Sequence, residues 1–180
     1  MTSSLSLHSP PAAGFDQPFE MLGACHERVR RMLGLLLRLR AHLQDRGPNE
    51  PAQQAARDVL RYFDLAAPQH HEDEERHVLP ALRLSGDAAL VALAQRLQDD
   101  HRAMSTAWAL LRPALAALAQ GQWPASGAAV AWQQWQDFAA LYRGHLQAED
   151  GQAFVAAKRL APAAAQAAMG AEMAARRGLR

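Results

Sequence analysis

Hydrophobic residues recur every three or four positions along most of this chain, which is the spacing of one face of an α-helix. The pattern predicts five helical segments, at about residues 15–45, 50–84, 87–120, 128–159 and 162–177. Asp87 is expected to cap the third segment, and Pro68 and Pro80 should distort the second one. Four long segments with short connections predict an all-α protein, an up-down-up-down four-helix bundle with an additional short C-terminal helix.

Composition agrees with an all-helical fold and argues against two classes of partner. Ala, Leu, Gln and Arg are abundant and Ile is absent, which favours helices over sheets. The 19 Lys and Arg residues are balanced by 18 Asp and Glu residues. This balance argues against a nucleic-acid binder and against a polybasic membrane anchor. No apolar run is long enough to span a bilayer, so no membrane partner is expected.

The ends of the chain and its cysteine content bear on domains and location. Residues 1–14 are rich in Ser and Pro and have little pattern, so they are predicted to be a disordered arm before a single domain at residues 15–180. They have neither a basic start nor a continuous apolar run, so no signal peptide is expected. Cys25 is the only cysteine, which fits a reducing compartment and a cytoplasmic location.

Four of the eight histidines lie one on each long segment and follow an internal repeat: His26, His70, His101 and His145. The first two are 44 residues apart, as are the last two, and a shift of 75 residues maps one pair onto the other. The same shift maps Glu74 onto Glu149. Each predicted hairpin therefore carries a lone His on its first helix and a His-x-x-x-Glu on its second.

The spacing of these polar residues predicts a metal site in the bundle. Residues four apart lie on one face of a helix, and each of the four histidines lies within an apolar stripe. An unpaired buried carboxylate costs several kcal/mol, and a divalent cation would remove that cost. The candidate metal ligands are His26, His70, Glu74, His101, His145 and Glu149.

Two positions leave alternatives open. His71 and Glu75 form a second His-x-x-x-Glu, one residue out of register. Since one residue turns a helix by about 100°, this pair is not expected to face the core together with His70 and Glu74. The 75-residue repeat favours His70 and Glu74. Glu72, Asp73 and Asp150 are otherwise interpreted as solvated residues or as acceptors for imidazole N–H groups.

The same residues resemble those of the hemerythrin-like, or HHE cation-binding, family. The resemblance rests on residues 26–28 (HER), 70–75 (HHEDEE) followed by Leu79-Pro80, 99–102 (DDHR) and 145–150 (HLQAED). It extends over about residues 15–159. It implies a four-helix bundle that holds a non-haem di-iron centre, with an open position for dioxygen, nitric oxide or peroxide, or a role in sensing iron itself.

Carried over to this chain, the resemblance implies that the four histidines are terminal ligands and that Glu74 and Glu149 bridge two iron ions. The family places the last carboxylate five residues after its His, which is Asp150 here, so this position stays open. Oxygen carriers of the family have a second His one turn after the third-helix His, where this chain has Ser105. The site would then have one imidazole fewer and be more symmetric, which favours sensing or storage over oxygen carriage.

These observations lead to one predicted function and two alternatives. The chain is expected to be a di-iron protein that binds or senses a small diatomic ligand or peroxide, and not an enzyme. Zinc or manganese would also suit the ligand set. The alternatives are a helical interaction module with a structural zinc and a di-metal oxidase or peroxidase. Trp108 and Phe138 are expected to line the pocket, and Tyr62 or Tyr142 could hydrogen-bond a bound ligand. The sequence does not identify a protein partner.

Overall fold

The computed structural model describes residues 14–123 and 127–179, and all of its regular elements in that part are helical. The arm predicted for residues 1–14 lies, except for Gly14, outside the described residues. The elements, with π-helical turns marked η, are α1 (Pro18–Arg46), α2 (Glu50–Arg61), η1 (Tyr62–Ala66), α3 (Ala67–Asp73), η2 (Glu74–Val78), α4 (Leu79–Arg83), α5 (Ala88–Ala119), α6 (Ala128–Ala148), η4 (Glu149–Ala153), α7 (Phe154–Leu160) and α8 (Ala163–Arg176).

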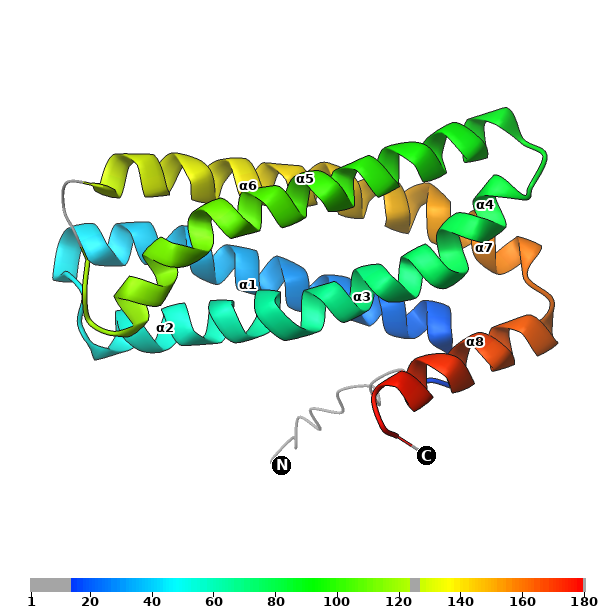
Figure 1. Cartoon of the computed structure of the whole chain (residues 1–180), viewed down its shortest axis with the longest axis horizontal. Helices are drawn as coiled ribbons and strands as arrows, with labels where there is room; N and C mark the ends of the chain where they lie inside the picture. The colour runs from blue at the N-terminus through cyan, green and yellow to red at the C-terminus, as the bar shows by residue number, and fades with distance from the viewer. Residues whose placement is uncertain (1–13, 124–126, 180) are drawn as a thin grey trace, which may run out of the picture.

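The long helices form a bundle. The helix α2 packs against α1 and α5, and α6 packs against α5 and α1. The elements α2 to α4 follow one another as a single helical rod, as do α6 and α7, while α8 lies across one end of the bundle (Figure 1). The predicted helical class, the five segments and the additional C-terminal helix are therefore confirmed.

The distortions predicted for the second segment take the form of π turns. Pro68 lies in the first turn of α3, directly after η1, and Pro80 lies in the first turn of α4, directly after η2. Proline has no N–H to donate, and its ring clashes with the preceding turn of a regular α-helix. A π turn spaces the backbone groups differently, and the rod continues through both prolines.

The predicted N-cap of the third helix is also confirmed. The carboxylate of Asp87 accepts hydrogen bonds from the backbone N–H groups of Ala89 (2.8 Å) and Leu90 (3.4 Å). Asn49 caps α2 in the same way, with its side chain accepting from the N–H of Ala52. Side-chain acceptors at these ends satisfy donors that have no partner within the helix.

The apolar core is divided into two clusters with a buried polar layer between them. Along α1, Leu22 belongs to one cluster and Val29 to the other, and His26 lies between them. Along α5, His101 lies in the same way between Leu97 and Met104. Apolar packing on both sides holds the polar side chains at one level of the bundle.

The helix α8 is fixed to the bundle by ion pairs with a buried carboxylate and by one close backbone approach. Asp73 on α3 is fully buried and accepts hydrogen bonds from the guanidinium groups of Arg176 and Arg177. At Gly170, an added Cβ would lie 1.8 Å from the carbonyl oxygen of Phe15, so only glycine fits there. None of the described helices is both long enough and apolar enough to cross a membrane.

Candidate metal centre

The six predicted ligands meet in the buried polar layer, and none of them is more than 3% exposed. The carboxylate of Glu74 lies between three imidazoles. Its Oε1 is 3.0 Å from Nε2 of His70 and 3.6 Å from Nε2 of His26. Its Oε2 is 3.4 Å from Nε2 of His101. The two oxygens of Glu74 thus face opposite sides of the cluster, as a bridging carboxylate requires.

Glu149 has a similar place on the opposite rod. Its Oε2 lies 3.2 Å from Nε2 of His26 and 3.0 Å from Nε2 of His145. The Nε2 atoms of His101 and His145 are 3.3 Å apart. Of Glu149 and Asp150, it is Glu149 whose carboxylate faces the cluster, while Asp150 contacts the outer nitrogen of His26.

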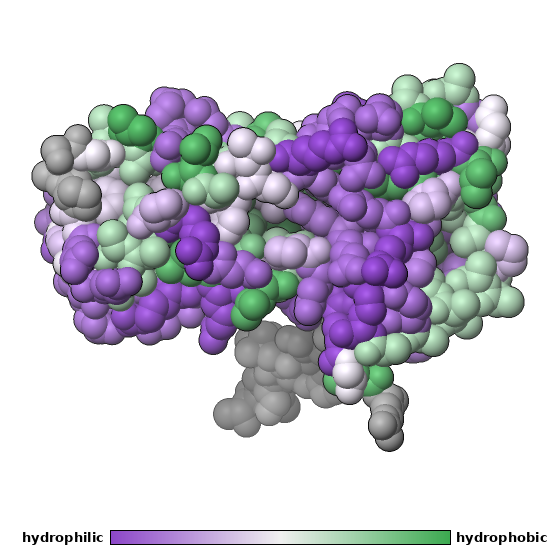
Figure 2. Space-filling model, in the orientation of Figure 1, coloured by the Kyte–Doolittle hydropathy of each residue, from purple (hydrophilic) through white to green (hydrophobic). Residues whose placement is uncertain are grey.

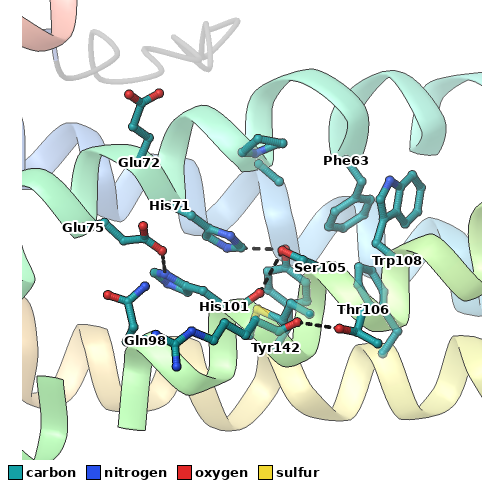
Figure 3. Close-up of a pocket in the computed structure, with 15 residues that line it drawn as sticks. Phe63, His71, Glu72, Glu75, Gln98, His101, Ser105, Thr106, Trp108 and Tyr142 are labelled. Atoms are coloured by element: carbon teal, nitrogen blue, oxygen red, sulfur yellow. Dashed lines mark hydrogen bonds and ion pairs between the residues drawn. The ribbon is translucent and has the colours of Figure 1, made fainter. Parts of the chain in front are cut away.

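A seventh side chain, His71, joins the cluster, contrary to the expectation that it could not face the core together with His70. Its ring stacks on that of His101, with the centroids 4.1 Å apart and the planes at 8° (Figure 3). The potential ligand atoms form two groups, each with its atoms within 4.8 Å of one another. One group is His26, His70, Glu74 and Glu149, and the other is His71, Glu74, His101 and His145.

The width of the core-facing stripe explains why both histidines reach the cluster. A helix in a bundle has two neighbouring helices, and its inward face covers about 100° or more, which is the turn from one residue to the next. His70 is directed toward His26 on α1 and His71 toward His101 on α5. The 75-residue repeat could not reveal His71, because the residue at the repeated position is Leu146.

The presence of His71 also changes the expectation drawn from Ser105. Ser105 lies on the exposed side of α5 and donates a hydrogen bond to the carbonyl oxygen of His101. The expected site had one imidazole fewer and two similar halves. Instead the cluster contains five imidazoles, two in one group and three in the other, because His71 from α3 comes beside His101.

Carboxylates behind the imidazoles continue the repeat. Nδ1 of His26 lies 2.7 Å from Asp150, and Nδ1 of His101 lies 2.8 Å from Glu75. Each of these carboxylates directly follows one of the two cluster glutamates, and Glu75 and Asp150 are themselves 75 residues apart. A carboxylate at Nδ1 fixes the orientation of the ring and directs the Nε2 lone pair to the cluster. The interpretation of Asp150 as an acceptor for an imidazole N–H group agrees with its contact with His26, whereas Asp73 is neither solvated nor beside an imidazole, because it is fully buried and pairs with Arg176 and Arg177. The acceptor beside His101 is Glu75, which the sequence suggests only as a partner of His71.

The repeat is less regular behind the other two histidines. Nδ1 of His145 lies 3.4 Å from the carboxylate of Asp100, and 75 residues earlier the chain has Cys25. Nδ1 of His70 has no hydrogen-bond partner among the described residues. The two halves of the cluster therefore differ in their outer contacts as well as in the number of imidazoles.

The two cluster glutamates have the same local backbone. Glu74 is the first residue of η2, and Glu149 is the first residue of η4. π turns are rare in proteins, and those that occur are often found at functional sites. Each inserts one extra residue without ending the helix. Here they place Val78 and Ala153, four residues further on, back in the apolar core.

The electrostatics of the cluster reflect strong coupling between its members. Burial by itself would lower the pKa of His26, but the nearby carboxylates of Glu149 and Glu74 raise it to about 9. Burial would raise the pKa of Glu74, but the imidazoles around it hold that pKa well below its usual range. Burial and the neighbouring imidazoles lower the pKa of His71, which keeps this ring neutral. A neutral imidazole with a free lone pair is the form that binds a metal.

The donor set fits divalent cations. In the described part of the chain, Nε2 of His26, both ring nitrogens of His70 and both oxygens of Glu74 and Glu149 are buried without a hydrogen-bond partner. Buried polar atoms are normally paired, so this many unpaired atoms at one place indicates a missing partner. Ligand bonds of about 2.0–2.2 Å put the donors of one ion within roughly 4.4 Å of one another, close to the spread observed.

A cavity of about 660 Å³ opens beside the group that contains His71. Trp108 and Phe138 line it, as predicted, and so does Tyr142, whose hydroxyl is 3.5 Å from Nε2 of His71. Tyr62, the other tyrosine considered, instead donates to the carbonyl oxygen of Cys25. Figure 2 shows this face of the molecule hollowed near its middle, with apolar residues between hydrophilic ones.

Together, the bundle and its buried cluster define a class of protein: helical proteins that hold metal cations between their helices. Residues 17–157 match the model of the hemerythrin HHE cation-binding domain, and the chain belongs to this family. Membership implies binding of metal cations. The chain is also 39% identical over 70 residues to an uncharacterized protein of Haemophilus influenzae, a match that covers 39% of this chain and 41% of that protein.

Proposed function

We propose that this chain binds two iron ions in the cluster and uses the pair to bind or sense a small ligand such as dioxygen, nitric oxide or peroxide. The observation that carries the proposal is the pair of ligand groups joined by Glu74. His26 and His70 would hold one ion, and His71, His101 and His145 the other. Glu74 and Glu149 would bridge the two. The hemerythrin-like up-down-up-down order of the four rods, with each rod contacting its neighbours, is part of the same proposal.

The choice of iron rests on the donor chemistry. Imidazole nitrogens and carboxylate oxygens suit iron, zinc and manganese, but the absence of thiolate ligands from the described cluster makes a structural zinc site of the usual kind a poorer match. Bound iron would supply reversible one-electron chemistry and a coordination position for a small ligand. The chain's own contribution is a buried site with fixed rings, carboxylates that offset the cationic charge, and an adjoining cavity.

The residues around the cluster fit a binding role. The carboxylates of Asp150 and Glu75 keep two imidazoles in place, so the rings need no reorganisation when a ligand arrives. The phenol of Tyr142 is protonated, because burial raises its pKa well above the usual range. Its hydroxyl lies at the cavity end of the cluster, where it can donate a hydrogen bond to a small acceptor.

The test is the absorption spectrum of protein expressed with ample iron, compared with its metal analysis. A coloured protein with near-ultraviolet charge-transfer absorption, changed reversibly when dioxygen is admitted to the reduced form, is expected. A colourless protein that carries zinc under these conditions would support the structural alternative. Steady consumption of peroxide in the presence of a reductant would favour the enzymatic alternative.

A further inference from the structure

The cavity beside His71 is far larger than the small ligands considered so far require. It measures about 660 Å³, whereas one water molecule occupies roughly 30 Å³ in the liquid and a diatomic molecule is of similar size. Pockets for organic molecules are usually about 300–1,000 Å³, with apolar walls and a few polar groups. The cavity therefore has the dimensions of a site for an organic compound.

The walls of the cavity are chemically divided. One end presents the rings of Phe63 and Trp108, whose centroids are 5.2 Å apart, and the buried ring of Phe138. The other end presents His71 and the hydroxyl of Tyr142 (Figure 3). A ligand that satisfies both ends has a flat aromatic body and a single polar head.

The charges at the rim already have partners. Glu75 contacts His101, Glu72 contacts Arg76, and Arg102 contacts Asp99, at 2.8, 2.6 and 3.0 Å. A charged ligand would have to compete with these pairs, and a neutral body would not. The rim thus favours an uncharged molecule.

The mouth of the cavity depends on small side chains of α5. Ser105 and Thr106 are exposed and line the opening. A large side chain at position 105 would occupy the cavity directly in front of His71. The fifth imidazole of the cluster, His71, comes from α3. Position 105 on α5 can therefore carry a small side chain and leave the cavity open.

We propose that this cavity is a binding site for a neutral aromatic compound with one hydroxyl group, a phenol, placed with its head toward His71 and Tyr142 and its ring against Phe63 and Trp108. This inference builds on the proposed function, because it places an organic molecule beside the candidate metal centre. The binding of a phenol depends on the walls of the cavity, and it is measured separately from the metal content.

The test is isothermal titration calorimetry of the protein as isolated, with 2-naphthol as the probe and metal analysis of the same sample. A dissociation constant on the order of 1 mM or tighter is expected for a ligand of this size. Ser105→Phe should weaken binding at least about tenfold, because its ring fills the cavity. Ala109→Phe, at an exposed position of α5 outside the cavity lining, should leave the dissociation constant unchanged.

Thr106→Phe provides a second blocking variant in case Ser105→Phe does not fold, and it should weaken binding in the same direction. Metal-loaded wild-type protein that does not bind 2-naphthol would overturn this inference and leave the proposed function intact. Equal binding by wild type and by a folded blocking variant would also overturn it, because the probe would then sit elsewhere. Metal-free protein that binds 2-naphthol would support the cavity, and the metal centre would then be tested separately on protein expressed with ample iron.

Discussion

The two halves of the cluster come from a repeated hairpin but have different surroundings. The half with His26 and His70 is buried, and the ring of Phe154 stacks against His26 with centroids 5.0 Å apart. The half with His71 and His101 borders the cavity. The repeated residues thus set the polar layer, and the residues that break the repeat decide which side a ligand can reach.

The two hairpins depart from the repeat at a few positions. His71 in the first hairpin corresponds to Leu146 in the second, and the π turn η1 precedes His70, whereas the region of α6 before His145 is regular. A repeat in the sequence therefore does not imply a site with two equivalent halves. If both halves bind metal, they should differ in affinity and in accessibility.

The largest effect is expected from Glu74→Gln, which removes the charge of the one residue shared by both groups. An amide oxygen is a poorer ligand than a carboxylate, and neither half would retain its full donor set. Metal content should fall from about two ions per chain to well below one, as ligand loss lowers affinity for both ions. Inductively coupled plasma mass spectrometry of dialysed protein measures this, and a variant that keeps both ions would refute the shared role.

His71→Leu makes the first hairpin resemble the second at this position. Only the half with His101 and His145 loses an imidazole, so one ion should be lost and the other kept. Loss of a group that only hydrogen-bonds a metal ligand costs roughly 10–100-fold in metal affinity. Loss of the ligand His71 itself should therefore weaken binding of the ion beside His101 and His145 by at least this factor.

Chelator competition measures the two affinities separately, and His77→Leu is the matched control. His77 lies on the same rod but pairs with Glu172, 2.7 Å away, and belongs to neither ligand group. Unchanged metal affinity in His71→Leu would show that its position beside His101 has no role in metal binding.

Glu75→Gln and Asp150→Asn compare the two halves through the carboxylates behind the imidazoles. Each removes the charge at one Nδ1 atom and should weaken metal binding by about 10–100-fold in its own half. Asp99→Asn removes an exposed carboxylate of α5 and serves as a control. If neither variant changes the chelator concentration that removes half of the metal, the carboxylates do not orient the rings.

The smallest effect is expected from Arg177→Ala, which acts on α8 away from the ligand atoms. It removes a guanidinium group that donates to the buried carboxylate of Asp73. The free energy of unfolding should fall by about 1.5–3 kcal/mol, the usual range for a hydrogen bond to a charged group. Urea denaturation measures this loss.

Arg46→Ala removes an exposed ion pair with Asp45 and should change stability by less than about 1 kcal/mol. Metal content should be unchanged in both arginine variants. Equal stability of the Arg177→Ala and Arg46→Ala variants would mean that the contact between Asp73 and Arg177 does not hold α8 to the bundle.

The sequence allowed much of this site to be predicted, and what it could not reveal has a clear cause. Helical periodicity predicted the five helices, and the repeat brought together His26, His101 and their partners. His71 was assigned to the wrong face, because a single stripe per helix was assumed where the helix has two neighbours. The cavity depends on side chains of α3, α5 and α6 that lie far apart in the sequence, and no local pattern reports their meeting.

The central claim is that the buried layer holds a pair of ions, and the most direct test is the metal content of the wild-type chain expressed with ample iron. About two iron ions per chain are expected, since each of the two ligand groups offers four side chains. Protein that is fully folded yet contains no more than one bound ion, whatever its identity, would contradict the account.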